Sequence, residues 1–196
     1  MTEMIGFYGK LPGRGDFVRH GWDDATVDAL DHWLADGLSA WRPDDDAEFA
    51  SLFAAVPLYE FYLPPGHIGP DAMLGVISPS VDRAGRYFFL VAGVTGAAPA
   101  LWHMAVNRAD FGHAAADAVY AALGADSDPD ALATAIAAAV PDNLVDVPWR
   151  ARLVTPDDAV FWAEGDGDPL VIRSPHLDTP LRAALLNTTP ITGGVA

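Results

Sequence analysis

The chain has 196 residues, which is enough for one sizeable hydrophobic core and short for two domains. Its 27 acidic residues against 11 basic ones give a net charge of −16, which disfavours binding to nucleic acid or to an anionic membrane surface. The chain contains no cysteine, so a disulfide scaffold, a thiol nucleophile and a thiolate metal site are excluded.

The sequence gives no reason to expect export or membrane insertion. Residues 1–10 lack the basic start and the long apolar run of a signal peptide. The longest notable apolar stretch, residues 87–94, is far too short to cross a bilayer. We therefore expect a soluble cytoplasmic protein.

The N-terminal part of the chain predicts a strand followed by two helices. Residues 4–8 form a short apolar run that Gly9 and Pro12 end, which is typical of a strand. Asp23 or Asp24 can cap the first helix, whose apolar residues recur at spacings of three and four: Val27, Leu30, Leu34, Leu38 and Trp41. Asp46 can cap the second helix, which carries Phe49, Leu52, Phe53 and Val56.

The middle of the chain predicts three strands. Residues 58–63 alternate well enough for one strand, and a loop rich in proline and glycine follows it. Residues 73–78 and 86–94 are two apolar runs joined by "PSVDRAG", residues 79–85. Because a proline- and glycine-bearing connection separates the two runs, we expect them to form a hairpin.

The C-terminal half predicts further helices and strands. Residues 99–123 are helical in pattern, with an interruption near 107–112 and a stop at Gly124. Asp128 followed by Pro129 opens another helix, which is expected to run through Val140. Short strands follow at 150–155, 159–164 and 169–174, then a helix at about 179–187 and a flexible tail at 188–196. The whole pattern predicts a single α/β domain over residues 1–187, with a mixed, largely antiparallel sheet flanked by helices.

Two short stretches concentrate the positive charge of this acidic chain. Five of the eleven cations lie in residues 10–19 and 78–87, together with two aspartates; the set is Lys10, Arg14, Asp16, Arg19, Asp82, Arg83 and Arg86. Arginine forks bind carboxylates bidentately, so one interpretation is that these residues brace the two loops against each other. The other is that guanidinium groups left unpaired dock an acidic or phosphorylated partner. The residues alone do not choose between the two.

Catalytic and ligand-binding motifs are weak or missing. The glycines at 6, 9, 13 and 15 fit neither a Walker-type phosphate loop nor a dinucleotide fingerprint, and Pro12 removes a backbone donor. A phosphate- or nucleotide-binding sensor or enzyme that uses residues 9–19 and 79–86 therefore stands only as the alternative function. The six histidines are scattered and the usual hydrolase and zinc motifs are absent, so we predict no catalytic residues, no metal and no cofactor.

The motifs as a group resemble one family. "GFYGKLPGRGDFVRHG" (6–21), "LDHWL" (30–34), "GVISPSVDRAGRYFFL" (75–90) and "FWAEGDGDP" (161–169) are similar to the TagF family of type VI secretion-associated proteins, in the same order from Met4 to about Leu186. The matching positions are Gly9, Lys10, Leu11, Pro12, Gly15, Asp16, Phe17, Arg19, Asp31, Trp33, Pro79, Ser80, Val81, Asp82, Arg83, Gly85 and Arg86.

This resemblance implies a function as well as a fold. It implies an α/β protein without enzymatic activity that represses type VI secretion after translation. It also implies that the partner is the forkhead-associated scaffold protein of the secretion system. The charged motif residues are then a partner-binding or structural polar cluster, and the oligomeric state is left open.

Overall fold

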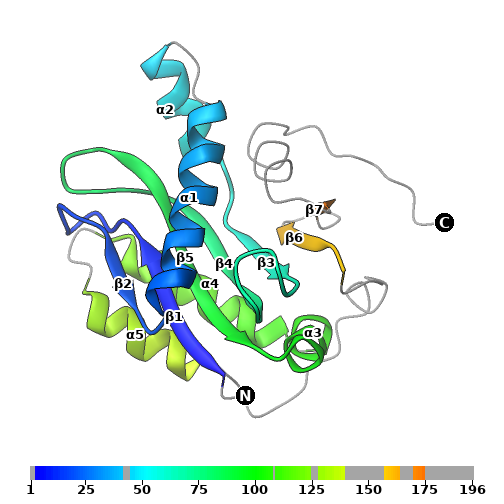
Figure 1. The fold of residues 1–196 in the computed structure, drawn as a ribbon. Coiled ribbons are helices and arrows are strands. Elements are labelled where there is room, and N and C mark those ends of the chain that lie inside the picture. Colours follow the sequence, from blue (N-terminus) through cyan, green and yellow to red (C-terminus); the bar gives the residue numbers. More distant parts are fainter. Residues whose placement is uncertain are drawn as a thin grey trace.

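The fold is seen in a computed structural model, which describes residues 3–41, 45–107, 109–124, 128–139, 157–163 and 170–174. These residues form the expected single α/β arrangement (Figure 1). The strand expected at 150–155, the helix expected at about 179–187 and the tail from 188 lie outside the described residues, as does the end of the domain at 187.

The described strands form one seven-stranded sheet in the order β2-β1-β5-β4-β3-β6-β7, and every pairing in it is antiparallel. The strands are β1 (Met4–Gly9), β2 (Val18–His20), β3 (Tyr59–Leu63), β4 (Ala72–Val81), β5 (Tyr87–Gly96), β6 (Ala159–Ala163) and β7 (Leu170–Ser174). The largely antiparallel sheet predicted from the sequence is therefore confirmed. β2 was not predicted, because three residues with one apolar side chain carry no period that a sequence reading can detect.

Helices cover both faces of the sheet. They are α1 (Asp24–Trp41), α2 (Asp46–Ala54), α3 (Ala98–Asn107), α4 (Ala109–Ala122) and α5 (Pro129–Ala138). In Figure 1, α1 crosses the near face of the sheet, whereas α4 and α5 lie behind it. The buried apolar side chains accordingly form two clusters, one under α1 and α2 and the other under α3, α4 and α5.

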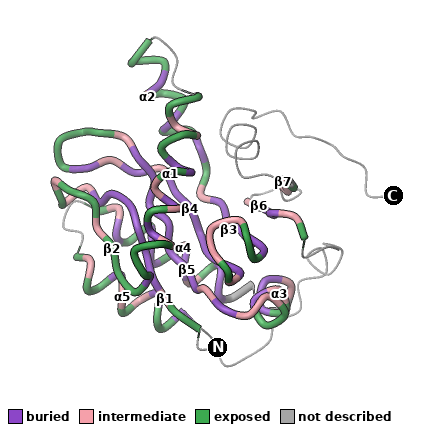
Figure 2. The backbone as a smooth tube through the Cα atoms, in the orientation of Figure 1, coloured by how far each residue is buried: buried purple, intermediate pink, exposed green. Residues whose placement is uncertain are grey.

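The two-sided cover explains the burial pattern of the central strands. All five residues of β3 are buried, and Figure 2 shows buried backbone along most of β4 and β5. Along β4, Leu74 and Val76 face the cluster under α3–α5, while Met73 and Ile77 face the cluster under α1 and α2. A strand covered on both faces reads as a continuous apolar run, which is why its period of two is faint in the sequence.

Three local predictions need correction. Asp45, not Asp46, caps α2, because its Oδ1 accepts the N–H groups of Ala47 at 2.8 Å and Glu48 at 3.1 Å. Leu52 is an outward residue of that helix, with 43% of its surface exposed. The strand β4 continues through Pro79 to Val81, so the hairpin loop is residues 82–86 only.

Other boundaries agree with the sequence in part. Asp23 caps α1 by accepting the N–H of Thr26 at 2.8 Å. The interruption expected near 107–112 separates α3 from α4 but is shorter than expected, because α3 ends at Asn107 and α4 begins at Ala109. Asp128 caps α5 with Pro129 as the first helical residue, as expected, but the helix ends at Ala138 with Ala139 as its C-cap and is therefore shorter than the expected helix through Val140.

Candidate functional site

The two motif stretches meet at one edge of the molecule. We call residues 10–17, which join β1 to β2, and residues 82–86, which join β4 to β5, the paired loops. They meet because β1 pairs with β5 in the sheet, which places the end of β1 beside the start of β5. The N–H of Arg83 donates to the carbonyl of Arg14 at 2.8 Å, and Arg86 Nη2 donates to the carbonyl of Gly15 at 2.5 Å.

Asp82 is the centre of this arrangement, and its side chain has no exposed surface. Its Oδ1 accepts the N–H groups of Ala84 at 2.9 Å and Arg86 at 3.0 Å. Its Oδ2 lies 2.6 Å from Arg86 Nε and 3.1 Å from Lys10 Nζ. Burial alone would raise the pKa of Asp82, but the hydrogen bonds from Arg86, Lys10 and Ala84 outweigh it and hold this pKa well below its usual range. Asp82 is therefore an ionised carboxylate that organises both loops.

Lys10, the only lysine of the chain, is buried between the loops. Its side chain is 7% exposed, and its ammonium group lies 5.1 Å from the centroid of the Phe17 ring. Its backbone is fixed on both sides, since its N–H donates to Phe89 O at 3.1 Å and its carbonyl accepts from Ser80 Oγ at 2.7 Å. Lys10 is thus the counter-charge of Asp82 and is covered by an aromatic ring.

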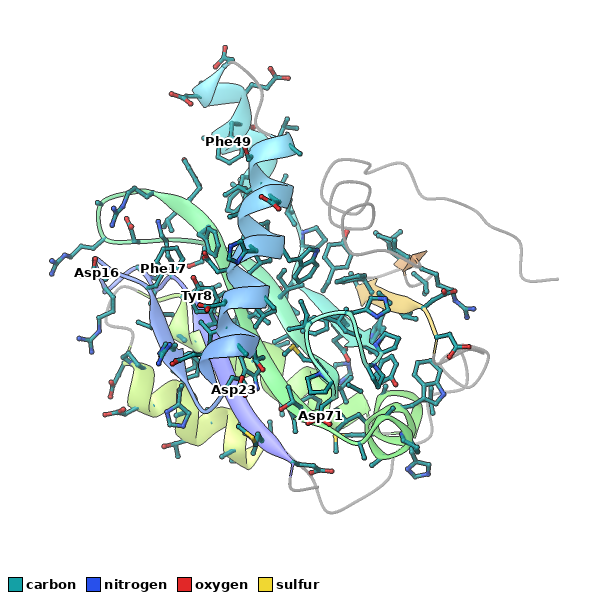
Figure 3. The ribbon with its side chains drawn as sticks, viewed as in Figure 1. Tyr8, Asp16, Phe17, Asp23, Phe49 and Asp71 are labelled. Atoms are coloured by element: carbon teal, nitrogen blue, oxygen red, sulfur yellow. The ribbon has the colours of Figure 1, made fainter. Side chains whose placement is uncertain are left out.

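Phe17 is held in a group of aromatic rings. It stacks on Tyr8 with 5.4 Å between ring centroids, and it meets Phe88 edge to face at 4.8 Å. Tyr8 Oη donates in turn to Asp31 Oδ1 of α1 at 2.5 Å. Burial, this hydrogen bond and the nearby Asp28 raise the pKa of Tyr8. Figure 3 shows Tyr8 and Phe17 beside each other, with Asp16 further toward the tip of the loop. Phe17 as a whole residue is nevertheless 45% exposed.

The seven residues of the predicted polar cluster divide into three groups. Lys10, Asp82 and Arg86 form a brace between the paired loops, in which Lys10 and Asp82 are buried and the Arg86 side chain is 61% exposed. Arg14, Asp16 and Arg83 line a surface pocket of about 300 Å³, together with Phe17 and its neighbours. Arg19 stands apart on β2, where its Nη2 lies 2.6 Å from Asp24 Oδ1 in an exposed pair.

The comparisons with known proteins identify the family. The family model of the TagF N-terminal domain, described as type VI secretion system-associated, matches residues 6–139. The chain belongs to the TagF family. Among solved structures, this TagF-family chain is similar to PA0076 from Pseudomonas aeruginosa PAO1, with a TM-score of 0.78 and 24% sequence identity over 98% of this chain and 100% of that one. At this identity the likeness supports the fold alone. A comparison with curated protein sequences gave no match.

Both paired loops of this TagF-family chain lie inside the matched region. Two aromatic residues that support them, Tyr8 and Phe88, were not among the sequence-predicted site residues. Tyr8 stands next to the motif residue Gly9, and Phe88 follows the motif residue Arg86 by two positions, which is a signal that a reading of charges alone overlooks. Among the described residues, no group of three or more histidine or acidic side chains is placed to hold a metal ion. None of the described helices has both the length and the apolar character needed to cross a bilayer.

Proposed function

We propose that this protein is a cytoplasmic repressor of type VI secretion that binds the forkhead-associated scaffold protein of the system and has no enzymatic activity. Membership of a type VI secretion-associated family supports the secretion context. The observation that carries the binding role is the division of the motif cations. Lys10 and Arg86 form ion pairs with Asp82, whereas Arg14 and Arg83 lie exposed around a surface pocket.

This division favours a docking surface over a catalytic or nucleotide site. A phosphate loop requires a lysine that reaches the bound phosphates. Lys10 is the only lysine of the chain, and it is buried against Asp82 under the ring of Phe17. The lysine of this glycine-containing loop is therefore paired with Asp82 and stabilises the contact between the paired loops. This leaves the nucleotide-binding alternative with arginines as the only exposed cations of the two stretches.

The test combines binding with secretion. Purified protein and purified scaffold protein from the same organism are titrated by isothermal calorimetry. In parallel, secretion of a type VI effector is measured in cells with and without overproduction of this protein. We expect saturable binding and lower secretion, and we expect the effect on secretion to disappear in a strain whose scaffold protein lacks the binding region.

The alternative function is tested on the same protein preparation. A ligand present at a hundred times its dissociation constant stabilises a fold by about 2.7 kcal/mol. A nucleotide or metal ion that binds would therefore raise the melting temperature in a thermal-shift screen. Under the repressor proposal, we expect nucleotides and divalent metal ions to leave the melting temperature unchanged. A clear shift with any nucleotide, together with absent scaffold binding, would replace the repressor proposal with the sensor or enzyme.

A further inference from the structure

The pocket on the paired loops has the composition of a protein-docking site. Phe17 has 45% of its surface exposed, and Arg14 and Arg83 line the same pocket. Aromatic residues and arginine are the side chains that most often dominate binding energy at protein interfaces. Phe17 is already held by Tyr8 and Phe88, so little side-chain freedom remains to be lost when a partner covers it.

The guanidinium group of Arg83 is available in this pocket. Its backbone N–H is used on Arg14 O, but within the described part of the chain its side chain makes no ion pair or hydrogen bond. Arg83 Nη2 lies 3.6 Å from the position that a Cβ atom on residue 15 would occupy. The guanidinium therefore lies over the backbone of Gly15, at the wall of the pocket, while its charge is not neutralised.

The remaining charges leave this surface positive. Arg14 is weakly neutralised, because its Nη2 is 3.9 Å from Asp128 Oδ1 and both side chains are more than half exposed. Asp16 lines the pocket as well, but no ion pair in the described structure joins it to Arg83. Lys10 and Arg86 share the single carboxylate of Asp82, so the brace carries one further positive charge.

We propose that this surface, formed by Phe17, Arg14 and Arg83, binds an acidic segment of a protein partner that carries an apolar side chain beside its carboxylates. The apolar side chain covers Phe17, and the carboxylates meet the two guanidinium groups. The chain as a whole is acidic, but charges beyond about 8 Å are screened at physiological salt, so the local cations decide the contact. The inference rests on the proposed function and names the chemistry of its partner.

The test compares four single variants in titrations with the purified scaffold protein at several salt concentrations. Arg83→Ala is expected to weaken binding about tenfold at 0.15 M salt, and added salt should weaken the binding of this variant less than that of the wild type. Phe17→Ala is expected to weaken binding by about tenfold or more without changing the salt dependence. The matched controls are Arg173→Ala, an exposed arginine of β7, and Leu52→Ala, whose exposure of 43% is close to that of Phe17. Both controls should bind as the wild type does.

Two further arms define the ligand chemistry. Asp16→Asn removes a negative charge from the pocket, so it should tighten binding by about threefold if the partner segment is acidic. Weaker binding of this variant would mean that the partner presents a cation there, which would overturn the proposal. Treating the scaffold protein with a phosphatase should leave binding unchanged. Loss of binding after that treatment would assign the arginines to a phosphorylated residue instead.

The outcomes separate this inference from the proposed function. If the wild type does not bind the scaffold protein, the proposed function fails and the inference fails with it. If the wild type binds and Arg83→Ala binds equally well, only the docking surface is refuted. Thermal unfolding of every variant accompanies the titrations. Arg83→Ala removes no side-chain partner in the described structure, so it keeps the test valid even if Phe17→Ala is destabilised.

Discussion

Asp82→Ala is the substitution that most directly tests the brace between the paired loops. It removes a carboxylate whose side chain is fully buried and leaves the ammonium group of Lys10 buried at 7% exposure without a counter-charge. It also removes the acceptor of two loop N–H groups, those of Ala84 and Arg86. The predicted consequence is a large loss of folding stability.

The magnitude follows from the exposure of each partner. Removing one member of a buried ion pair costs about 3–5 kcal/mol, mostly because an unpaired charge remains. The Arg86 side chain is 61% exposed, so solvent screening limits its share to about 1 kcal/mol or less. The two N–H groups lie in an exposed loop, where water can replace Asp82. We therefore expect a loss of about 4 kcal/mol, which corresponds to a melting temperature lower by about 10 °C for a chain of this length.

The assay is urea unfolding followed by circular dichroism and tryptophan fluorescence. The control is Asp16→Ala, an exposed aspartate of the same loop pair, which should stay within about 0.5 kcal/mol of the wild type. The double variant Lys10→Met with Asp82→Ala should recover at least half of the lost stability, because it no longer buries an unpaired charge. A loss below about 1 kcal/mol for Asp82→Ala, or simple additivity in the double variant, would refute the brace.

Three further predictions concern the same region. Gly9→Ala should cost more than about 3 kcal/mol in urea unfolding, because Gly9 has φ +145° and a Cβ there would lie 2.1 Å from Phe89 O. Gly66→Ala serves as its control and should cost only about 1 kcal/mol, because Gly66 has φ +91° with nothing within 4 Å of its Cβ position. Tyr8→Phe should cost about 1.5–3 kcal/mol of folding stability through loss of the hydrogen bond to Asp31. Because the folded pKa of Tyr8 is raised, this stability difference should be present below about pH 10 and shrink as the pH rises further. An unchanged difference at alkaline pH would contradict the hydrogen-bond assignment. Because the folded pKa of Asp82 is lowered, the contribution of its carboxylate to folding stability is present above about pH 4 and is lost as the pH falls. The stabilities of the wild type and Asp82→Asn should therefore converge in acid. A constant stability difference between them across pH-dependent unfolding would count against an ionised Asp82.

Local features of the sequence predicted much of the secondary structure. The cap at Asp128 with Pro129, the apolar spacing of residues 27–38 and the two apolar runs of the hairpin each act over a few residues. Such signals depend on backbone geometry and side-chain periodicity, which neighbouring residues largely set. They err by one or two residues where two candidates stand side by side, as Asp45 and Asp46 do at the start of α2.

Long-range pairing, in contrast, could not be predicted from local pattern. The motif residues of β1 and of the hairpin are some seventy positions apart, and they meet only because β1 pairs with β5. The free energy of that pairing comes from burying apolar side chains on both faces of the sheet, which no single segment contains. β2 could not be predicted for the same reason, because it is a strand only through its pairing with β1.

By itself, then, the sequence determined the composition of this protein, most of its helices and strands, and the two motif stretches that mark the family. Only the tertiary structure decided what each motif charge does. Lys10 and Arg83 are both cations in these stretches, yet one is buried against Asp82 and the other is exposed beside Phe17. The physical reason is that the role of a charge depends on its solvent exposure and on the nearest opposite charge, and both are set by contacts between distant parts of the chain.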